Sequence, residues 1–444
     1  MMPVQSRLGS VMVIVVMKFR ICFPALLFLA ISQVYSAQPN ILLIMADDVG
    51  TDAIGCYGGQ SYPTPHIDAL ATGGMKFNHA YAMPVCHPSR VCLMTGRYPF
   101  RFGAAGSRWG DYPDAAEGNS IGDVMRKGGY KTAVAGKWQM CFMKNDLHQP
   151  ERTGFDEWCL FGWHEGGRYH DPFLYQNGEY RNDVSGQYGP DLYVEFLTDF
   201  MKRCDDEGKP FFAYYPMALC HDVTDDLKSR HVSFAKDGRW MTYAEMMASM
   251  DDMVGRLVEF LEISGLRKDT LVIFTTDNGT AGASYLTVYE DGKMERPKIV
   301  SVRNGEVVPG GKGKTDDTGT RVPFIANWPG KIEAGTQSRE MMDLTDLLPT
   351  VAEIGKVDIS AMDLDGRSIA PVLQGTPDQA AKRDWIYIEH RGKRCIRSKN
   401  WKLYDDGRFF DLKNDPKEKH PVEAAGATYA KLKQQLDQMV APGE

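Results

Sequence analysis

The chain alternates apolar runs of strand length with segments that carry apolar residues at helical spacing. Five runs, 41–46, 132–135, 211–215, 271–276 and 322–326, are almost entirely apolar. Strands of this kind are typical of a sheet that is buried on both faces, because most of its strands are parallel and helices cover it. Methionine and leucine side chains recur at helical spacing over 246–261, and Gly265 is placed to end that helix. The pattern predicts an α/β fold with a large, mostly parallel but mixed central sheet and helices on both faces.

The last seventy residues show a different pattern. Short apolar runs joined by turns occupy 385–389, 394–397, 401–404 and 408–411, and a helical pattern follows near 422–439. They predict a small antiparallel sheet with one helix. We therefore expect a large α/β domain over 37–375 and a C-terminal subdomain over 376–444. The charged, glycine-rich segment 281–313 is predicted to be a loop that borders a site.

The N-terminus has the features of a secretory signal peptide. Lys18 and Arg20 precede an apolar run over 21–31, and small residues suited to cleavage follow before residue 37. We predict a signal peptide over 1–36, with Met17 as an alternative start, and hence export to the periplasm or the medium. The apolar run is too short to span a membrane, so no stable membrane anchor is expected. The alternative is an amphipathic helix of the mature fold.

Charge and cysteine usage narrow the class of protein further. The formal net charge is −7, and the first 36 residues contribute only basic groups to it. A nucleic-acid-binding protein normally presents a basic face, so we expect no nucleic-acid partner, although a local basic pocket for an anion is compatible with this charge. The nine cysteines are widely spaced without a CxxC pair, which indicates neither a zinc ribbon nor a dense disulfide scaffold and leaves room for one or two disulfides.

Residues suited to chemistry follow four of the predicted strands. They are Asp47-Asp48, Lys137, His221 and Asp277-Asn278. In an open parallel sheet the carboxyl ends of the strands meet at one edge, where ligands bind. Three carboxylates and an amide oxygen are hard ligands, which calcium or magnesium prefers. The alternative for each acidic pair is a helix cap or a solvated turn.

Cys86 opens a short segment that ends at Arg97. Pro88 suits the first position of a helix and Gly96 its end. Cys86 would then lie beside a helix N-terminus, where negative charge is favoured. From the residues alone, Cys86 is either a thiolate nucleophile or a buried structural thiol.

The run Cys86-His87-Pro88-Ser89-Arg90, followed by Thr95-Gly96-Arg97, resembles the signature of the type I sulfatases. In that family the cysteine of a Cys-x-Pro-Ser-Arg motif is oxidised after synthesis to formylglycine. Other segments resemble further motifs of the family, namely 40–48, 135–138, 276–279, 311–313 with 321–323, and 401–416. The likeness covers roughly residues 38 to 420. It implies an alkaline-phosphatase-like fold and a sulfuric ester hydrolase.

The resemblance also implies the parts of the site. It implies a calcium ion held by Asp47, Asp48, Asp277, Asn278 and the formylglycine made from Cys86, and a formylglycine-generating enzyme as a partner. The catalytic residues it implies are Cys86, Arg90, Lys137, His221 and Lys312. Lys137 and Lys312 would neutralise the sulfuryl oxygens, and His221 with Lys312 would protonate the departing alcohol oxygen.

One position departs from the family pattern in a way that matters. Gln139 stands where the family usually has a histidine, and glutamine cannot act as a base near neutral pH. His87, His221 or a water would then take the proton, or turnover would be impaired. Some carbohydrate-specific sulfatases resemble this chain in carrying glutamine there, so we assign Gln139 to substrate binding. The pattern at 316–320 also differs from the commoner one, which we expect to change the pocket wall.

The segment 163–172 mixes aromatic, imidazole and guanidinium groups that suit a sugar. From it we predict Arg168 and His170 as substrate-binding residues, with an ordinary structured loop as the alternative. The leading hypothesis is an exported, calcium-dependent sulfatase acting on a sulfated carbohydrate, either a polysaccharide or its oligosaccharides. Galactose or N-acetylgalactosamine 4-sulfate is the candidate sugar. The alternatives are a phosphoryl or phosphonate hydrolase of the same superfamily and a glycan-binding module that has lost turnover.

Overall fold

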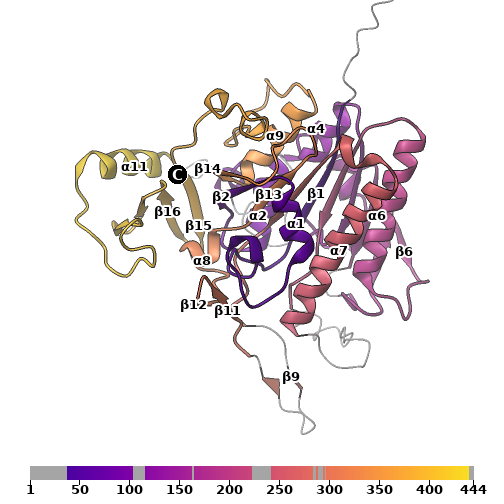
Figure 1. Cartoon of the computed structure of the whole chain (residues 1–444), viewed down its shortest axis with the longest axis horizontal. Helices are drawn as coiled ribbons and strands as arrows, with labels where there is room; N and C mark the ends of the chain where they lie inside the picture. Colours follow the sequence, from indigo (N-terminus) through magenta and orange to yellow (C-terminus); the bar gives the residue numbers. More distant parts are fainter. Residues whose placement is uncertain are drawn as a thin grey trace, which may run out of the picture. The chain divides into compact units, whose positions relative to one another are not determined.

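A ten-stranded mixed sheet organises the chain, as the computed structural model shows (Figure 1). Its strands lie in the order β14 (Thr336–Asp343), β2 (Met75–Tyr81), β13 (Phe324–Asn327), β8 (Thr270–Thr276), β1 (Asn40–Ala46), β7 (Phe211–Pro216), β3 (Lys131–Gly136), β4 (Glu157–Phe161), β5 (Leu174–Gln176) and β6 (Glu179–Arg181). The central strands β8, β1, β7, β3 and β4 are parallel, whereas β13 is antiparallel to both of its neighbours. The predicted mixed sheet is confirmed, and all five predicted strands belong to it.

Strand β1 shows why the sheet is buried on both faces. Ile41, Leu43 and Met45 belong to one hydrophobic core cluster, and the alternate residues of the strand belong to the other. Alternate side chains of a strand point to opposite faces, so an apolar strand fills two cores. Full burial of each large aliphatic side chain contributes about 1.5–3 kcal/mol.

Helices cover both faces of this sheet. Helices α6 (Gly189–Asp206) and α7 (Tyr243–Ile263) pack in one cluster, and α2 (Cys86–Thr95), α4 (Ile121–Lys127) and α9 (Leu347–Ile354) in the other. A capping box between Thr242 and Glu245 starts α7, and Gly265 follows its end with a φ of 78°. The methionines of the predicted 246–261 stripe are buried, so that stripe is core. The remaining helices are short: α1 (Pro65–Thr72), α5 (Gln149–Arg152), α8 (Asp317–Thr320), α10 (Ala370–Leu373), and the 3-10 turns Gly55–Tyr57, Pro99–Phe102, Leu266–Asp269, Leu344–Asp346 and Pro377–Gln379.

The predicted C-terminal sheet is confirmed. Strands β15 (Ile386–His390), β16 (Lys393–Arg397), β17 (Trp401–Tyr404) and β18 (Phe409–Asp411) pair antiparallel in sequence order, and α11 (Gly426–Gln438) follows them. The segment 281–313 is not only a loop. It contains the antiparallel pairs β9 (Thr287–Val288) with β10 (Met294–Glu295) and β11 (Val300–Arg303) with β12 (Glu306–Pro309). The polar residues that suggested a loop also suit partly exposed strands such as β11 and β12.

The structure describes residues 38–103, 116–162, 165–222, 242–283, 287–288, 294–295 and 297–439. The predicted signal peptide lies outside these residues. None of the helices in this part of the chain combines the length and the hydropathy that a membrane span requires. The eight cysteines they contain are all free thiols, so none of the disulfides for which the sequence left room forms among them.

Gly136 allows the chain to turn sharply between strand β3 and Lys137. Its φ is 122°, and a Cβ built on it would lie 2.2 Å from the backbone oxygen of Pro216. We expect Gly136→Ala to lower the free energy of unfolding by about 3 kcal/mol or more, through both clash and strain. Urea denaturation measures it. Gly208→Ala is the control, since Gly208 has a φ of 63° and open space around it, and it should cost only about 1 kcal/mol. Equal losses would contradict the role assigned to the Pro216 contact.

Candidate active site

The carboxyl ends of five sheet strands bring the predicted residues together. Asp47 follows β1, Lys137 follows β3, and Asp277 follows β8, while His221 comes five residues after β7. Strand β2 has the same direction as β8, because β13 is antiparallel to both. The chain that leaves β2 therefore delivers Cys86 to the same edge of the sheet.

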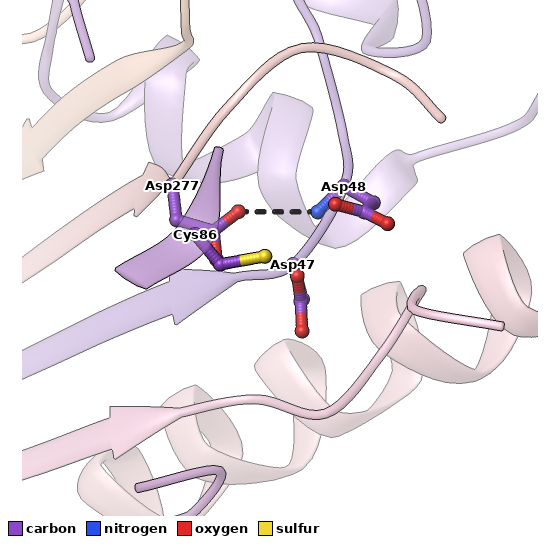
Figure 2. Close-up of side chains that lie close together, drawn as sticks. All are labelled: Asp47, Asp48, Cys86 and Asp277. Atoms are coloured by element: carbon purple, nitrogen blue, oxygen red, sulfur yellow. Dashed lines mark hydrogen bonds between the residues drawn. The ribbon is translucent and has the colours of Figure 1, made fainter. Parts of the chain in front are cut away.

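Three aspartates and the cysteine form a buried cluster that could hold a metal ion (Figure 2). One ligand atom from each of Asp47, Asp48, Cys86 and Asp277 lies within 4.8 Å of the others. The backbone N–H of Asp48 donates to Oδ1 of Asp277 at 3.2 Å, and the Cys86 sulfur points toward the aspartate pair. The amide of Asn278 donates to Oδ1 of Asp48 at 2.8 Å, which turns the amide oxygen away from that bond.

Three cations neutralise these carboxylates. Lys137 contacts Oδ2 of Asp47. Lys312 lies 2.7 Å from Asp48, and Arg90 donates to Oδ2 of Asp277 at 2.8 Å. Arg90 also donates to the backbone oxygen of Lys137 at 3.0 Å, which ties helix α2 to the end of β3. Arg90 and Lys137 are almost fully buried, so these pairs are desolvated and depend on one another.

The pKa values of the aspartates show how this charge is distributed. Burial raises the pKa of Asp48 to about 7, since the favourable charge of Lys312 does not offset burial and the nearby carboxylates. Burial likewise raises the pKa of Asp277, with Asp47 as the next cause. Burial would also raise the pKa of Asp47, but Lys137 and the other cations hold it well below its usual range. The three cations alone thus hold the pKa of only one of the three carboxyl groups below its usual range.

The residues present fit a divalent cation. Oδ1 of Asp47 and Oδ1 of Asn278 are buried without a hydrogen-bond partner, although buried acceptors normally have one. Both atoms belong to the predicted ligand set, and all the oxygens are hard ligands. A cation would satisfy both atoms and favour the ionised form of the two carboxyl groups whose pKa is raised.

Cys86 is the first residue of α2, with Val85 as its N-cap. The helix therefore begins two residues before Pro88, which the sequence analysis predicted to be its first residue. Proline is tolerated there because the N–H groups of the first turn have no partner within the helix. Burial raises the pKa of the Cys86 thiol to about 12. Burial among carboxylates therefore disfavours the thiolate of the unmodified side chain.

Arg168 lies behind His221. The Arg168 side chain is buried, and its Nη1 donates to Nδ1 of His221 at 2.7 Å and to the backbone oxygen of Asp222 at 2.8 Å. Nδ1 of His221 also lies 2.8 Å from the backbone oxygen of Asp222, so the Arg168 guanidinium and this carbonyl together hold the ring in place. Nε2 faces the site, 4.0 Å from Oδ2 of Asp48. Burial, with Lys312 and Lys137, lowers the pKa of His221 well below its ordinary value.

The other two predicted sugar-binding residues lie in different surroundings. Gln139 is nearly buried with a φ of 57°, and its Oε1 has no hydrogen-bond partner. Its backbone oxygen lies 3.0 Å from Nδ1 of His87, so that histidine is beside the position where the family pattern has one. His170 is half-buried, and its ring packs on Tyr188 with centroids 4.8 Å apart. The pairing of Arg168 with His221 was missed because residues 53 apart in the chain give no sequence signal.

The fold and this site define an alkaline-phosphatase-like hydrolase. The structure aligns with the crystal structure of Ps i-CgsB with a TM-score of 0.70 and 28% identity, over 90% of this chain and 92% of that one. The family model described as sulfatase matches residues 39–357, and the one described as N-sulphoglucosamine sulphohydrolase, C-terminal, matches 314–442. The chain belongs to the sulfatase family and is a sulfuric ester hydrolase.

Two curated relatives agree with this assignment. The chain is 29% identical to human arylsulfatase A over 421 residues, which cover 85% of this chain and 77% of that protein. It is 31% identical to N-acetylgalactosamine-6-sulfatase of Rattus norvegicus over 371 residues, which cover 76% and 66%. The predicted fold, family and enzyme class are confirmed.

Proposed function

We propose that this enzyme is an exported, calcium-dependent sulfatase that removes sulfate from a sulfated carbohydrate through a formylglycine made from Cys86. The observation that carries the proposal is the position of the Cys86 sulfur, among three buried aspartates at the start of α2. A buried thiol with a raised pKa contributes no nucleophile by itself, so oxidation to an aldehyde gives this position a use. The predicted leader over 1–36 supports export to the periplasm or the medium, and a formylglycine-generating enzyme would be the maturation partner.

The side chains around Cys86 suit sulfate-ester hydrolysis. When present, calcium would polarise the sulfate oxygens, and the hydrated aldehyde would supply the nucleophilic oxygen. Asp47, Asp48, Asp277 and Asn278 would hold the ion. Arg90 keeps Asp277 and the end of β3 in place. Lys137 and Lys312 present ammonium groups to the same space, where they would neutralise charge on the sulfuryl oxygens.

His221 and Lys312 are placed to protonate the leaving alcohol. Both approach Asp48, the lysine at 2.7 Å and Nε2 of His221 at 4.0 Å, so an oxygen leaving on this side would meet the Lys312 ammonium and the His221 ring. The histidine that the family usually has at position 139 is thought to accept a proton during turnover. In this chain His87 contacts the backbone oxygen of Gln139, so its ring lies beside that position. This favours His87 over a distant residue as the substitute base.

Arg168 acts in this proposal as a positioning residue for His221. We expect Arg168→Met to lower kcat about tenfold to a hundredfold with little change in KM, because the His221 ring loses the donor that orients it. Steady-state kinetics on the preferred substrate measures both constants. Arg181→Met, which removes a guanidinium from a surface pair with Asp183, is the control. A raised KM at unchanged kcat would instead support direct contact of Arg168 with the sugar.

A carbohydrate substrate is supported by the solved relatives. Ps i-CgsB was crystallised in complex with k-i-k-neocarrahexaose. For this chain we propose galactose or N-acetylgalactosamine 4-sulfate as the reacting unit, with Gln139 and His170 beside the sugar. The 6-sulfate esters are the natural comparison, since one relative is an N-acetylgalactosamine-6-sulfatase.

Mass spectrometry of the Cys86 peptide, combined with sulfate release, tests the proposal. The protein would be co-expressed with a maturation enzyme and given 4- and 6-sulfated monosaccharides and oligosaccharides. We expect conversion of Cys86 and release from a sugar ester. Conversion with release only from aryl or phosphonate esters would reject the carbohydrate substrate. Persistent lack of conversion, with glycan binding retained, would favour a binding module.

A further inference from the structure

A tight turn of the C-terminal sheet places basic side chains next to the active site. Strands β15 and β16 are joined by Arg391 and Gly392, whose φ values are 50° and 75°. A two-residue turn with positive φ at both positions matches the right-handed twist of the two strands, so the turn has a well-defined conformation. His390 and Lys393 flank the tip.

Two cavities of about 430 and 400 Å³ meet at this turn, since His390 and Arg391 line both. The smaller cavity is also lined by Val85 and Pro88, which flank Cys86 in the chain. The larger is lined by Gly313, the neighbour of Lys312, and an ideal Cβ on Gly313 would lie 3.8 Å from Nε2 of His390. We call the two cavities together the basic cleft. Each cavity is thus lined by chain neighbours of a catalytic residue, Cys86 for the smaller and Lys312 for the larger.

The basic cleft has more positive charge than its own carboxylates neutralise. Of its six cations, Arg408 pairs with Asp406 and Lys417 with Glu306, each at 2.8 Å, and Arg394 lies 3.5 Å from Asp405. Three carboxylates line the cleft. Glu418 lies 2.8 Å from Lys402, Asp316 accepts from the backbone N–H of Thr318 at 2.9 Å, and Glu389 accepts from the Tyr387 hydroxyl at 2.9 Å. Within the described part of the chain, three exposed cations of the cleft have no carboxylate partner, namely Lys314, Arg391 and Lys393.

The unpaired cations of the cleft differ from the cations of the reaction site, which already have carboxylate partners. Lys137, Lys312 and Arg90 each contact an aspartate of the metal cluster. Lys314, Arg391 and Lys393 are exposed and have no carboxylate partner among the described residues, on a chain whose net charge is −7. A surface that is negative overall repels an anionic polymer except where it is locally basic, so this cleft would attract and orient it.

We propose that the basic cleft binds a second anionic group of the substrate, carried by a sugar next to the one that bears the reacting sulfate. The inference rests on the proposed carbohydrate sulfatase function and specifies it: the substrate class is a multiply charged oligosaccharide. The second group is a carboxylate or a sulfate, because Lys314, Arg391 and Lys393 can bind either.

Titration calorimetry on Cys86→Ser protein, which does not consume the ligand, tests the proposal. One arm uses a chondroitin 4-sulfate tetrasaccharide, which places carboxylates beside the sulfated sugar, and the other an ι-carrageenan tetrasaccharide, which adds sulfates. N-acetylgalactosamine 4-sulfate and galactose 4-sulfate are the singly charged references. We expect a tetrasaccharide from at least one arm to bind at least tenfold more tightly than its reference. Lys314→Glu/Arg391→Glu should abolish that preference.

Lys331→Glu/Arg339→Glu is the matched control, because it reverses two exposed charges outside the cleft. It should keep the preference, and an equal loss in this control would overturn the proposal. Absence of any preference in the parent protein would also overturn it. Sulfate release from the singly charged esters by the converted enzyme tests the proposed function independently of the cleft. Charge-dependent binding without sulfate release would reject the proposed sulfatase substrate but support anion binding in the cleft.

Discussion

Cys86→Ala is expected to reduce sulfate release by at least about 10⁴-fold in kcat, because no other side chain of the cluster can supply the aldehyde oxygen. The Cys86 side chain is buried at the first position of α2, and alanine fits the same space. The fold and the metal cluster should therefore survive. The measurement is sulfate release at saturating substrate, with circular dichroism to establish folding.

Cys92→Ala is the matched control for this experiment. Cys92 lies in the same helix and is equally buried, but it packs in the hydrophobic core. Its replacement should cost about 1 kcal/mol of stability and leave kcat within about twofold. If Cys86→Ala retained more than about a hundredth of the activity, or if Cys92→Ala lost as much, the assignment of Cys86 as the precursor of the nucleophile would fail.

The central strands were predictable because they are buried on both faces. β1 and β7 are apolar at nearly every position, and β8 has an apolar centre flanked by threonines. The short length of these runs and their β-branched and aromatic residues favour a buried strand over a buried helix. β2 and β14 were not predicted, since polar residues interrupt them and one of their faces is less deeply buried. Their place in the sheet depends on partners far away in the sequence.

The site was predictable in its parts rather than in its contacts. Asp47 and Asp277 come directly after apolar strands, and the Cys86 motif is local, so the sequence could place both at one edge of the sheet. The role of Arg168 depends on a contact across 53 residues with His221. Arg391 enters the site region through the tertiary placement of a hairpin about 300 residues after Cys86. Spacing alone carries no signal for such contacts.

Removal of the divalent cation is expected to abolish turnover and to lower the melting temperature. A ligand at a hundred times its Kd stabilises the folded state by about 2.7 kcal/mol, roughly 3 °C for a protein of this size. Without the ion, the oxygens of Asp47 and Asn278 that have no hydrogen-bond partner would be buried and unsatisfied. We therefore expect the loss of turnover to be complete rather than partial. Calcium should restore both properties after chelation, and failure of any divalent cation to do so would reject the metal site.

The stabilisation by the cation should depend on pH, and the raised pKa of Asp48 determines whether it increases or decreases with pH. Burial raises the pKa of Asp48 from its unfolded value near 4 to about 7 in the cation-free protein. The protonated form contributes stability that is fully present below the unfolded pKa and is lost as pH rises through about 7. A cation replaces that proton, so the calcium-induced rise in melting temperature should be larger at pH 8 than at pH 5.5. Asp48→Asn should reduce this pH dependence, because its amide does not titrate there; the same rise at both pH values in the parent protein would show that Asp48 is not a ligand.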